Sequence, residues 1–175
     1  MKTLKQILNE NDEWAGHKCY EYAVGCKREK SSILPSVPGA TANAPMKNYS
    51  MDELRRGLEA DGAIHAGSGS NIPPPKKGYR IIYAATSYGH PKGNDFHFYR
   101  QDPNGTWSHR LHNINSNKDA SGKTIINPHE ADRDYSKTLF NGLKSGTHYH
   151  NGAFFYVPED GLATAKAVSP PKFNK

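Results

Sequence analysis

Residues 95–109 read DFHFYRQDPNGTWSH and predict a β-hairpin that carries one histidine on each strand. The tetrapeptide at 102–105 suits a type I turn, because Asp favours the first position, Pro the second and Gly the last. With Gly105 left-handed, the loop closes with a bulge and Asp102 pairs with Thr106. A two-residue turn at Asn104-Gly105 is the alternative, and Pro103 favours the bulged loop.

The bulged register brings the two histidines together. It pairs Tyr99 with His109 and His97 with Leu111. Since side chains alternate between the faces of a sheet, His97 and His109 become diagonal neighbours on one face, about 7–8 Å apart at the backbone. A slip of one residue would turn His109 to the other face. The hairpin therefore predicts an imidazole pair.

A cysteine near the start of the chain supplies a candidate nucleophile. The segment 14–26 contains a turn at Gly16 and then a short helix that begins near Cys19 and ends near Gly25. In the first turn of a helix, unpaired backbone N–H groups and the helix dipole favour a thiolate and can bind an oxyanion. A Cys followed by a strand His and a polar residue on the next strand is the order of papain-like hydrolases.

These residues make the chain resemble the NlpC/P60 cysteine peptidases and, more loosely, the CHAP amidases. His97, the glycine turn and His109 follow the NlpC/P60 layout, and the aromatic Tyr22 three positions after Cys19 is similar to the CHAP motif. The usual NlpC/P60 Asp-Cys-Ser is absent, because Lys18-Cys19-Tyr20 stands in its place. The resemblance rests only on the Cys19 helix and the hairpin.

The resemblance implies an α+β, papain-like (NlpC/P60-like) core with N-terminal helices packed on an antiparallel sheet. It also implies a triad in which Cys19 attacks an amide carbonyl, His97 transfers the proton and His109 orients His97. Asn113 and Asp119 remain rivals of His109 for the third position, and Asp95 is a weaker one.

Length and composition fit one domain over residues 1–175. Hydrophobic residues make up 35% of the chain, and 16 Gly and 12 Pro predict a loop-rich α+β protein, with loop-rich segments at 31–49 and 66–77. No apolar run is long enough for a membrane helix. The first residues lack a signal-peptide core, so we expect synthesis in a cytoplasm, with export only by a secretion system or phage machinery.

Further helices and strands follow from local patterns. Helices are expected at residues 3–10 and after Ser50, where Ser50 and Glu53 form a capping box. Strands are expected at 78–85, 124–126 and 153–158, and residues 130–141 are expected to be helical or irregular.

Charge and metal-ligand patterns exclude several functions. The net charge is +6, but the basic residues are scattered and no nucleic-acid motif accompanies them. His148 and His150 could share one strand face, yet no metal-binding motif supports a zinc site, so no metal or cofactor is expected. The two cysteines lie seven positions apart in the expected helix, too far for a disulfide, and are expected to be reduced.

The functional prediction is a cysteine peptidase or amidase. The resemblance implies a peptide or peptidoglycan substrate, and a secreted toxin or effector of this class could have an immunity or secretion partner. A deamidase or transferase could use the same chemistry. The alternative from a different class is a non-catalytic binding or structural domain that uses the aromatic residues of the sheet, namely Phe96, Phe98, Tyr99, Trp107, Phe154 and Phe155.

Overall fold

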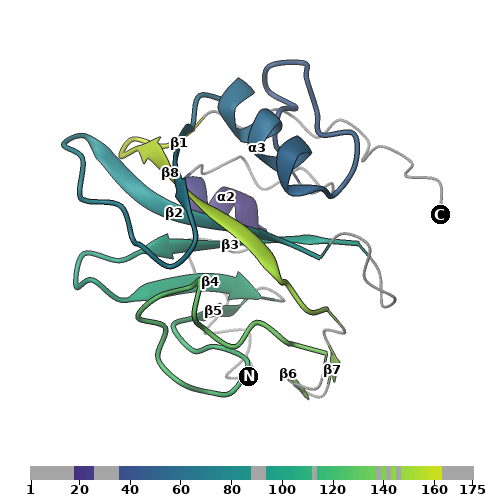
Figure 1. Cartoon of the computed structure of the whole chain (residues 1–175), viewed down its shortest axis with the longest axis vertical. Coiled ribbons are helices and arrows are strands. Elements are labelled where there is room, and N and C mark those ends of the chain that lie inside the picture. Colours follow the sequence, from purple (N-terminus) through teal and green to yellow (C-terminus); the bar gives the residue numbers. More distant parts are fainter. Residues whose placement is uncertain are drawn as a thin grey trace, which may run out of the picture.

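A six-stranded antiparallel sheet dominates the fold. The computed structural model describes residues 18–25, 36–87, 94–111, 114–136, 139–140, 143–144 and 147–162. The strand order in the main sheet is β1-β8-β2-β3-β4-β5 (Figure 1). The bounds of these strands are β1 Ile64–Ser68, β2 Tyr79–Thr86, β3 Phe96–Gln101, β4 Trp107–Leu111, β5 Ile114–Ser116 and β8 Asn151–Pro158. Two short strands, β6 (Leu139–Phe140) and β7 (Leu143–Lys144), form a separate hairpin.

Two helices in the described ranges pack on this sheet. α2 covers Cys19–Val24 and ends at Gly25, whose φ of 73° is left-handed as expected of a helix C-terminus. α3 covers Met51–Ala60 and begins after Ser50, whose side chain accepts the Glu53 amide at 3.3 Å. Both helices were expected, and the one expected at residues 3–10 lies outside the described residues.

Only half of the expected capping box forms at α3. The Glu53 carboxylate accepts the Lys47 amide at 2.7 Å and binds Arg56, instead of turning back to the Ser50 amide. That amide donates to Asn48 Oδ1 at 2.8 Å. A neighbouring Asn has therefore replaced the glutamate without leaving the donor unpaired.

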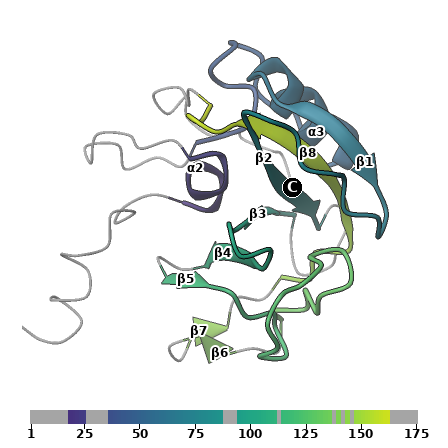
Figure 2. The ribbon, with the colours of Figure 1, turned by 90° about the vertical axis from the view of Figure 1, so that its left-hand side faces the viewer.

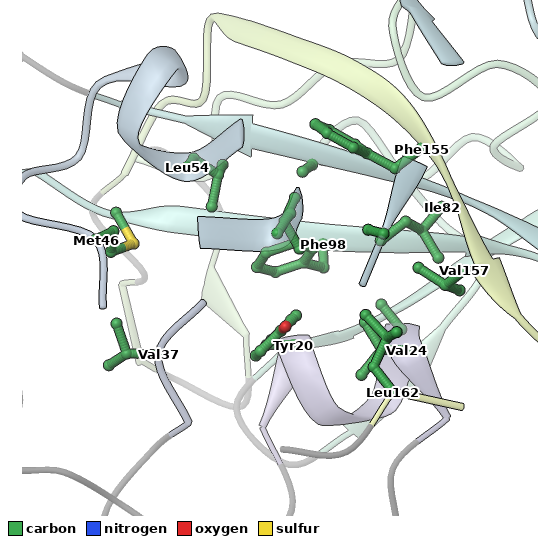
Figure 3. Close-up of a cluster of buried hydrophobic side chains, with 14 of the residues drawn as sticks. Tyr20, Val24, Val37, Met46, Leu54, Ile82, Phe98, Phe155, Val157 and Leu162 are labelled. Carbon is green, nitrogen blue, oxygen red and sulfur yellow. The ribbon is translucent and has the colours of Figure 1, made fainter. Parts of the chain in front are cut away.

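Both faces of the sheet are buried, because alternate residues of its central strands enter two different clusters. The helix-side cluster contains Phe98, Ile82 and Phe155 from the sheet, with Tyr20 and Val24 of α2 packed against them (Figure 3). Leu54 and Leu58 of α3 complete the same cluster. Figure 2 shows α2 and the segment 117–136 on different sides of β3 and β4.

The second cluster, here called the loop-side cluster, faces that segment. It contains Tyr83, Tyr99, Trp107 and Phe154 from the sheet, together with Ile125, Tyr135 and Tyr149 from outside the strands. A sheet buried on both faces explains the near-continuous apolar sequence of β2. Residues 117–136 thus form a second layer that covers this face of the sheet.

The hairpin has the expected register. Tyr99 pairs with His109, and the Asp102 amide donates to the Thr106 carbonyl at 2.8 Å. Gly105 has a φ of 83°, and its amide donates to the Asp102 carbonyl at 2.9 Å. The bulged type I loop is therefore confirmed.

Other expectations hold only in part. The strands expected at 78–85 and 153–158 correspond to β2 and β8, and the α+β class with helices on an antiparallel sheet is confirmed at this coarse level. The strand expected at 124–126 is wrong. Thr124 makes one isolated bridge to Lys118, while the Ile125 amide and carbonyl bond to Asn117 and Trp107, so no ladder develops.

Segment boundaries also shift. Residues 36–49, the described part of the loop-rich segment 31–49, form turns without a helix or strand, whereas residues 66–68 belong to β1 and not to a loop. None of the helices in the described ranges is long and apolar enough to cross a membrane.

Candidate functional site

The imidazoles of His97 and His109 form a direct hydrogen bond. His97 Nε2 lies 2.7 Å from His109 Nδ1, and His109 Nε2 lies 2.9 Å from the Lys118 carbonyl oxygen. A carbonyl oxygen only accepts, so His109 Nε2 carries a hydrogen. In neutral His109 the other nitrogen must then accept, and His97 Nε2–H is the donor. The prediction that the hairpin places His97 and His109 side by side is confirmed.

Aromatic rings enclose this imidazole pair. His97 stacks on Tyr149 with ring centroids 5.2 Å apart, and His109 stacks on Tyr99 at 5.1 Å. Tyr135 contacts both imidazoles. The two histidines are 2% and 0% exposed, so the pair belongs to the loop-side cluster.

Burial keeps His109 neutral. Desolvation lowers the pKa of its imidazole to about 4, although the hydrogen bond to Lys118 and the charge of Asp119 act in the opposite direction. At neutral pH His109 is therefore an uncharged hydrogen-bond acceptor for His97.

Cys19 is held as a neutral thiol. It packs against the helix-side cluster, which Phe98 also enters, whereas His97 on the same strand turns to the loop-side cluster. Burial and, to a smaller extent, the Asp95 carboxylate raise the pKa of the Cys19 thiol to about 12, while hydrogen bonds from nearby backbone amides act in the opposite direction. This direction is opposite to the thiolate expected at a helix N-terminus.

Asp95 is the charged group next to both clusters. It accepts the Tyr149 hydroxyl at 2.7 Å, and Tyr149 in turn stacks on His97. Its charge also acts on Cys19. Asp95 therefore acts electrostatically on the Cys19 thiol and accepts a hydrogen bond from the tyrosine that stacks on His97.

The rivals for the third catalytic position have other partners. Asp119 Oδ1 accepts the amides of Ser121 and Lys123 at 2.9 Å, and its Oδ2 accepts the Asp132 amide at 3.2 Å. These bonds hold a turn after β5 and do not involve an imidazole. Asn113 lies outside the described residues.

No metal centre emerges in the described part of the chain. His148 and His150 do come together, with ring centroids 5.9 Å apart. No group of three or more His, Cys, Asp or Glu side chains in the described ranges is arranged to hold an ion. A pair alone leaves a zinc ion without the remaining ligands of a closed site.

The aromatic residues of the sheet do not form a surface. Five of the six expected to bind a partner, namely Phe98, Tyr99, Trp107, Phe154 and Phe155, are 0% exposed. The prediction that these aromatic residues bind a partner is wrong, because the segment 117–136 and the helices cover both faces of the sheet. Tyr135, Tyr149 and the Lys118 carbonyl were missed as partners of the histidines, since no local pattern links them to the hairpin.

The comparisons with known proteins bear on the choice between the two functional classes. No family model matches the chain, and no solved structure matches it. The chain is 52% identical over 118 residues to insoluble matrix shell protein 1 of Ruditapes philippinarum, an alignment that covers 67% of this chain and 71% of that protein. The chain belongs to the family of this shell matrix protein.

Membership of this family corrects the enzymatic expectations. The resemblance to NlpC/P60 peptidases and CHAP amidases is wrong, and so are the predictions of a cysteine peptidase, a peptidoglycan amidase, a toxin or an effector. Cys19 packs against the helix-side cluster, whereas His97 and His109 pack with tyrosines of the loop-side cluster. The family favours the structural alternative.

Proposed function

We propose that this chain is a non-catalytic structural protein of an insoluble extracellular matrix. The observation that carries the proposal is its 52% identity to insoluble matrix shell protein 1 over most of both chains. Two proteins with this level of identity share their fold, and because a fold alone does not determine a function, the role printed for the relative is carried over as the proposal to be tested. The proposal includes export from the cell, which we expected from the sequence only through a secretion system or phage machinery.

The candidate site supports a structural role. A nucleophile needs a thiolate, but the pKa of the Cys19 thiol is raised to about 12. The imidazole pair is buried, and His109 makes hydrogen bonds through both nitrogens. Buried polar groups that are fully hydrogen-bonded fix the position of the strands that carry them.

The test is self-association of the purified full chain, measured with amidase activity on the same samples. We expect material that moves to the pellet as protein concentration rises, and equal pelleting by Cys19→Ala. We expect no peptide or peptidoglycan cleavage by either protein. A chain that stays monomeric at every concentration would contradict the proposal, and so would cleavage that disappears in Cys19→Ala.

A further inference from the structure

Two short stretches of the sequence match the acceptor pattern for N-linked glycosylation, which is Asn-x-Ser/Thr with any residue except proline in the middle. They are Asn48-Tyr49-Ser50, directly before α3, and Asn104-Gly105-Thr106, in the turn between β3 and β4. Neither stretch contains Cys19 or a residue of the imidazole pair. A pattern of three residues is short, so the surroundings of each asparagine decide whether a glycan fits there.

The turn that contains Asn104 lies at the ends of β3 and β4 (Figure 1). Pro103, Asn104 and Gly105 are all exposed. A Cβ added at Gly105 would meet no atom within 4 Å, so the space beside the asparagine is open. A glycan is bulky and hydrated, and an exposed turn can carry one without disturbing the core.

The carboxamide of Asn104 has a fixed oxygen and an uncommitted nitrogen. Its Oδ1 accepts the Thr106 amide at 3.1 Å and the Thr106 hydroxyl at 2.7 Å. These bonds hold the two residues that define the pattern against each other. Nδ2, the atom that an N-linked glycan occupies, makes no hydrogen bond in the part of the chain that the structure describes. A glycan on Nδ2 therefore leaves both contacts of the turn in place.

Asn48 has a different environment. It is half-buried, and its Oδ1 accepts the Ser50 amide at 2.8 Å. The Ser50 hydroxyl accepts the Glu53 amide at 3.3 Å as the N-cap of α3. Tyr49, the middle residue, packs against the helix-side cluster. This second stretch is tied to the start of a helix and to the core, so it serves as the internal comparison for Asn104.

The position of the turn is compatible with self-association. The strand order places β3 and β4 inside the sheet, whereas β1 and β5 are its edge strands. Edge strands are where a sheet pairs with another chain. A glycan at the end of the β3–β4 hairpin does not sit on either edge strand, so the chain can carry it and still associate through its edges.

We propose that Asn104 is N-glycosylated when the chain is exported through a eukaryotic secretory pathway. The donor is an oligosaccharide linked to a lipid diphosphate. A bond forms between Asn104 Nδ2 and the anomeric carbon of the first sugar, while the bond from that carbon to the diphosphate oxygen breaks. Nδ2 gives up one proton, and the lipid diphosphate leaves. The inference rests on the proposed export, because the donor and its transferase act in the lumen of that pathway.

The test is expression of the full chain behind a cleavable secretion signal in insect cells. We expect the Asn104 peptide to carry an N-glycan. When peptide-N-glycosidase removes the glycan in heavy-oxygen water, Asn104 should become a heavy-oxygen-labelled aspartate, which peptide mass spectrometry locates. Chain that stays inside the cells is recovered from the microsomal fraction and mapped in the same way. A translocated chain in which Asn104 is unmodified would overturn the proposal.

Variants assign the glycan independently. Asn104→Gln should lose the glycan and migrate faster on a gel, whereas Asn48→Gln is the matched control and should keep it. Thr106→Ala should also lose the glycan, and Thr106→Ser should keep it, because serine retains the hydroxyl that the pattern requires. A glycan that persists in Asn104→Gln and disappears in Asn48→Gln would overturn the proposal.

The two proposals fail separately. Chain purified from bacteria carries no N-glycan of this kind, so the pelleting assay on that material tests the structural role alone, and Asn104→Gln should pellet there as the wild type does. Normal pelleting with an unmodified Asn104 after export would overturn only this inference. A chain that is glycosylated at Asn104 but stays monomeric would contradict only the structural role.

Discussion

At the scale of single residues, the environment of Cys19 decides whether the thiol is reactive. Its pKa of about 12 lies roughly three units above that of an ordinary thiol, so at pH 8 its thiolate is about a thousandfold rarer. The higher nucleophilicity of a basic thiolate recovers part of that factor. In a Cys26→Ser background we expect iodoacetamide to alkylate Cys19 roughly a hundredfold more slowly than a peptide thiol.

The same experiment has an internal check at Asp95. Since the Asp95 carboxylate raises the pKa of Cys19, Asp95→Asn should lower it and speed alkylation. Asp52→Asn on the exposed first turn of α3 is the control and should change nothing. Rapid alkylation of the Cys26→Ser protein with a midpoint below pH 8 would show an activated thiol and contradict this account.

His109 gives the second residue-scale prediction, a loss of stability in acid. Its pKa is about 4 in the folded chain and 6.5 when unperturbed, so between these values the unfolded state binds a proton that the folded state does not. The free energy of unfolding should therefore fall as pH drops from about 6.5 to 4, by at most about 3 kcal/mol from this group. Below pH 4 this contribution no longer changes.

The measurement is urea unfolding of the wild type and of His109→Gln across this pH range. Glutamine can accept from His97 and donate to Lys118 but does not titrate. The stability of the variant should depend less on pH than that of the wild type. Parallel curves would show that His109 is not the group responsible.

At the scale of elements, the β3–β4 hairpin shows why local structure was predictable. Its turn residues and alternating side chains lie within one short stretch, and each choice agrees with the same register. The strand expected at 124–126 does not form. Its apolar residues pack from a loop, because the backbone of Ile125 bonds to Asn117 and Trp107. β-Propensity alone cannot separate these cases.

Gly105 in this turn gives a prediction that depends on backbone conformation and not on packing. A Cβ added at Gly105 would meet no atom within 4 Å, so only its φ of 83° opposes a side chain. Gly105→Ala should lower the free energy of unfolding by about 1–2 kcal/mol. Gly105→Asn should cost less, because Asn tolerates the left-handed region. Equal effects of Ala and Asn in urea titrations would show that another contact is lost.

At the scale of the whole molecule, function was less predictable than fold. The order Cys19, His97, His109 is what a hydrolase would show, but order does not reveal which face of the sheet each side chain meets. Cys19 and Phe98 share the helix-side cluster, whereas His97 packs with Tyr149, 52 residues further along the chain. Such contacts depend on the β8 and loop packing, which no local pattern encodes.

The two clusters share strands β2, β3 and β8, and we therefore expect them to unfold together. Leu54 of α3 is 0% exposed in the helix-side cluster, and Trp107 is 0% exposed in the loop-side cluster. Leu54→Ala should lower the free energy of unfolding by about 2–5 kcal/mol through the cavity that it leaves.

In a Trp14→Phe background, Trp107 fluorescence then reports on the other side of the sheet. Its transition should move to lower urea together with the far-ultraviolet circular dichroism signal. If the Trp107 transition kept its midpoint while the dichroism transition moved, the layer formed by residues 117–136 would be stable independently of the helices.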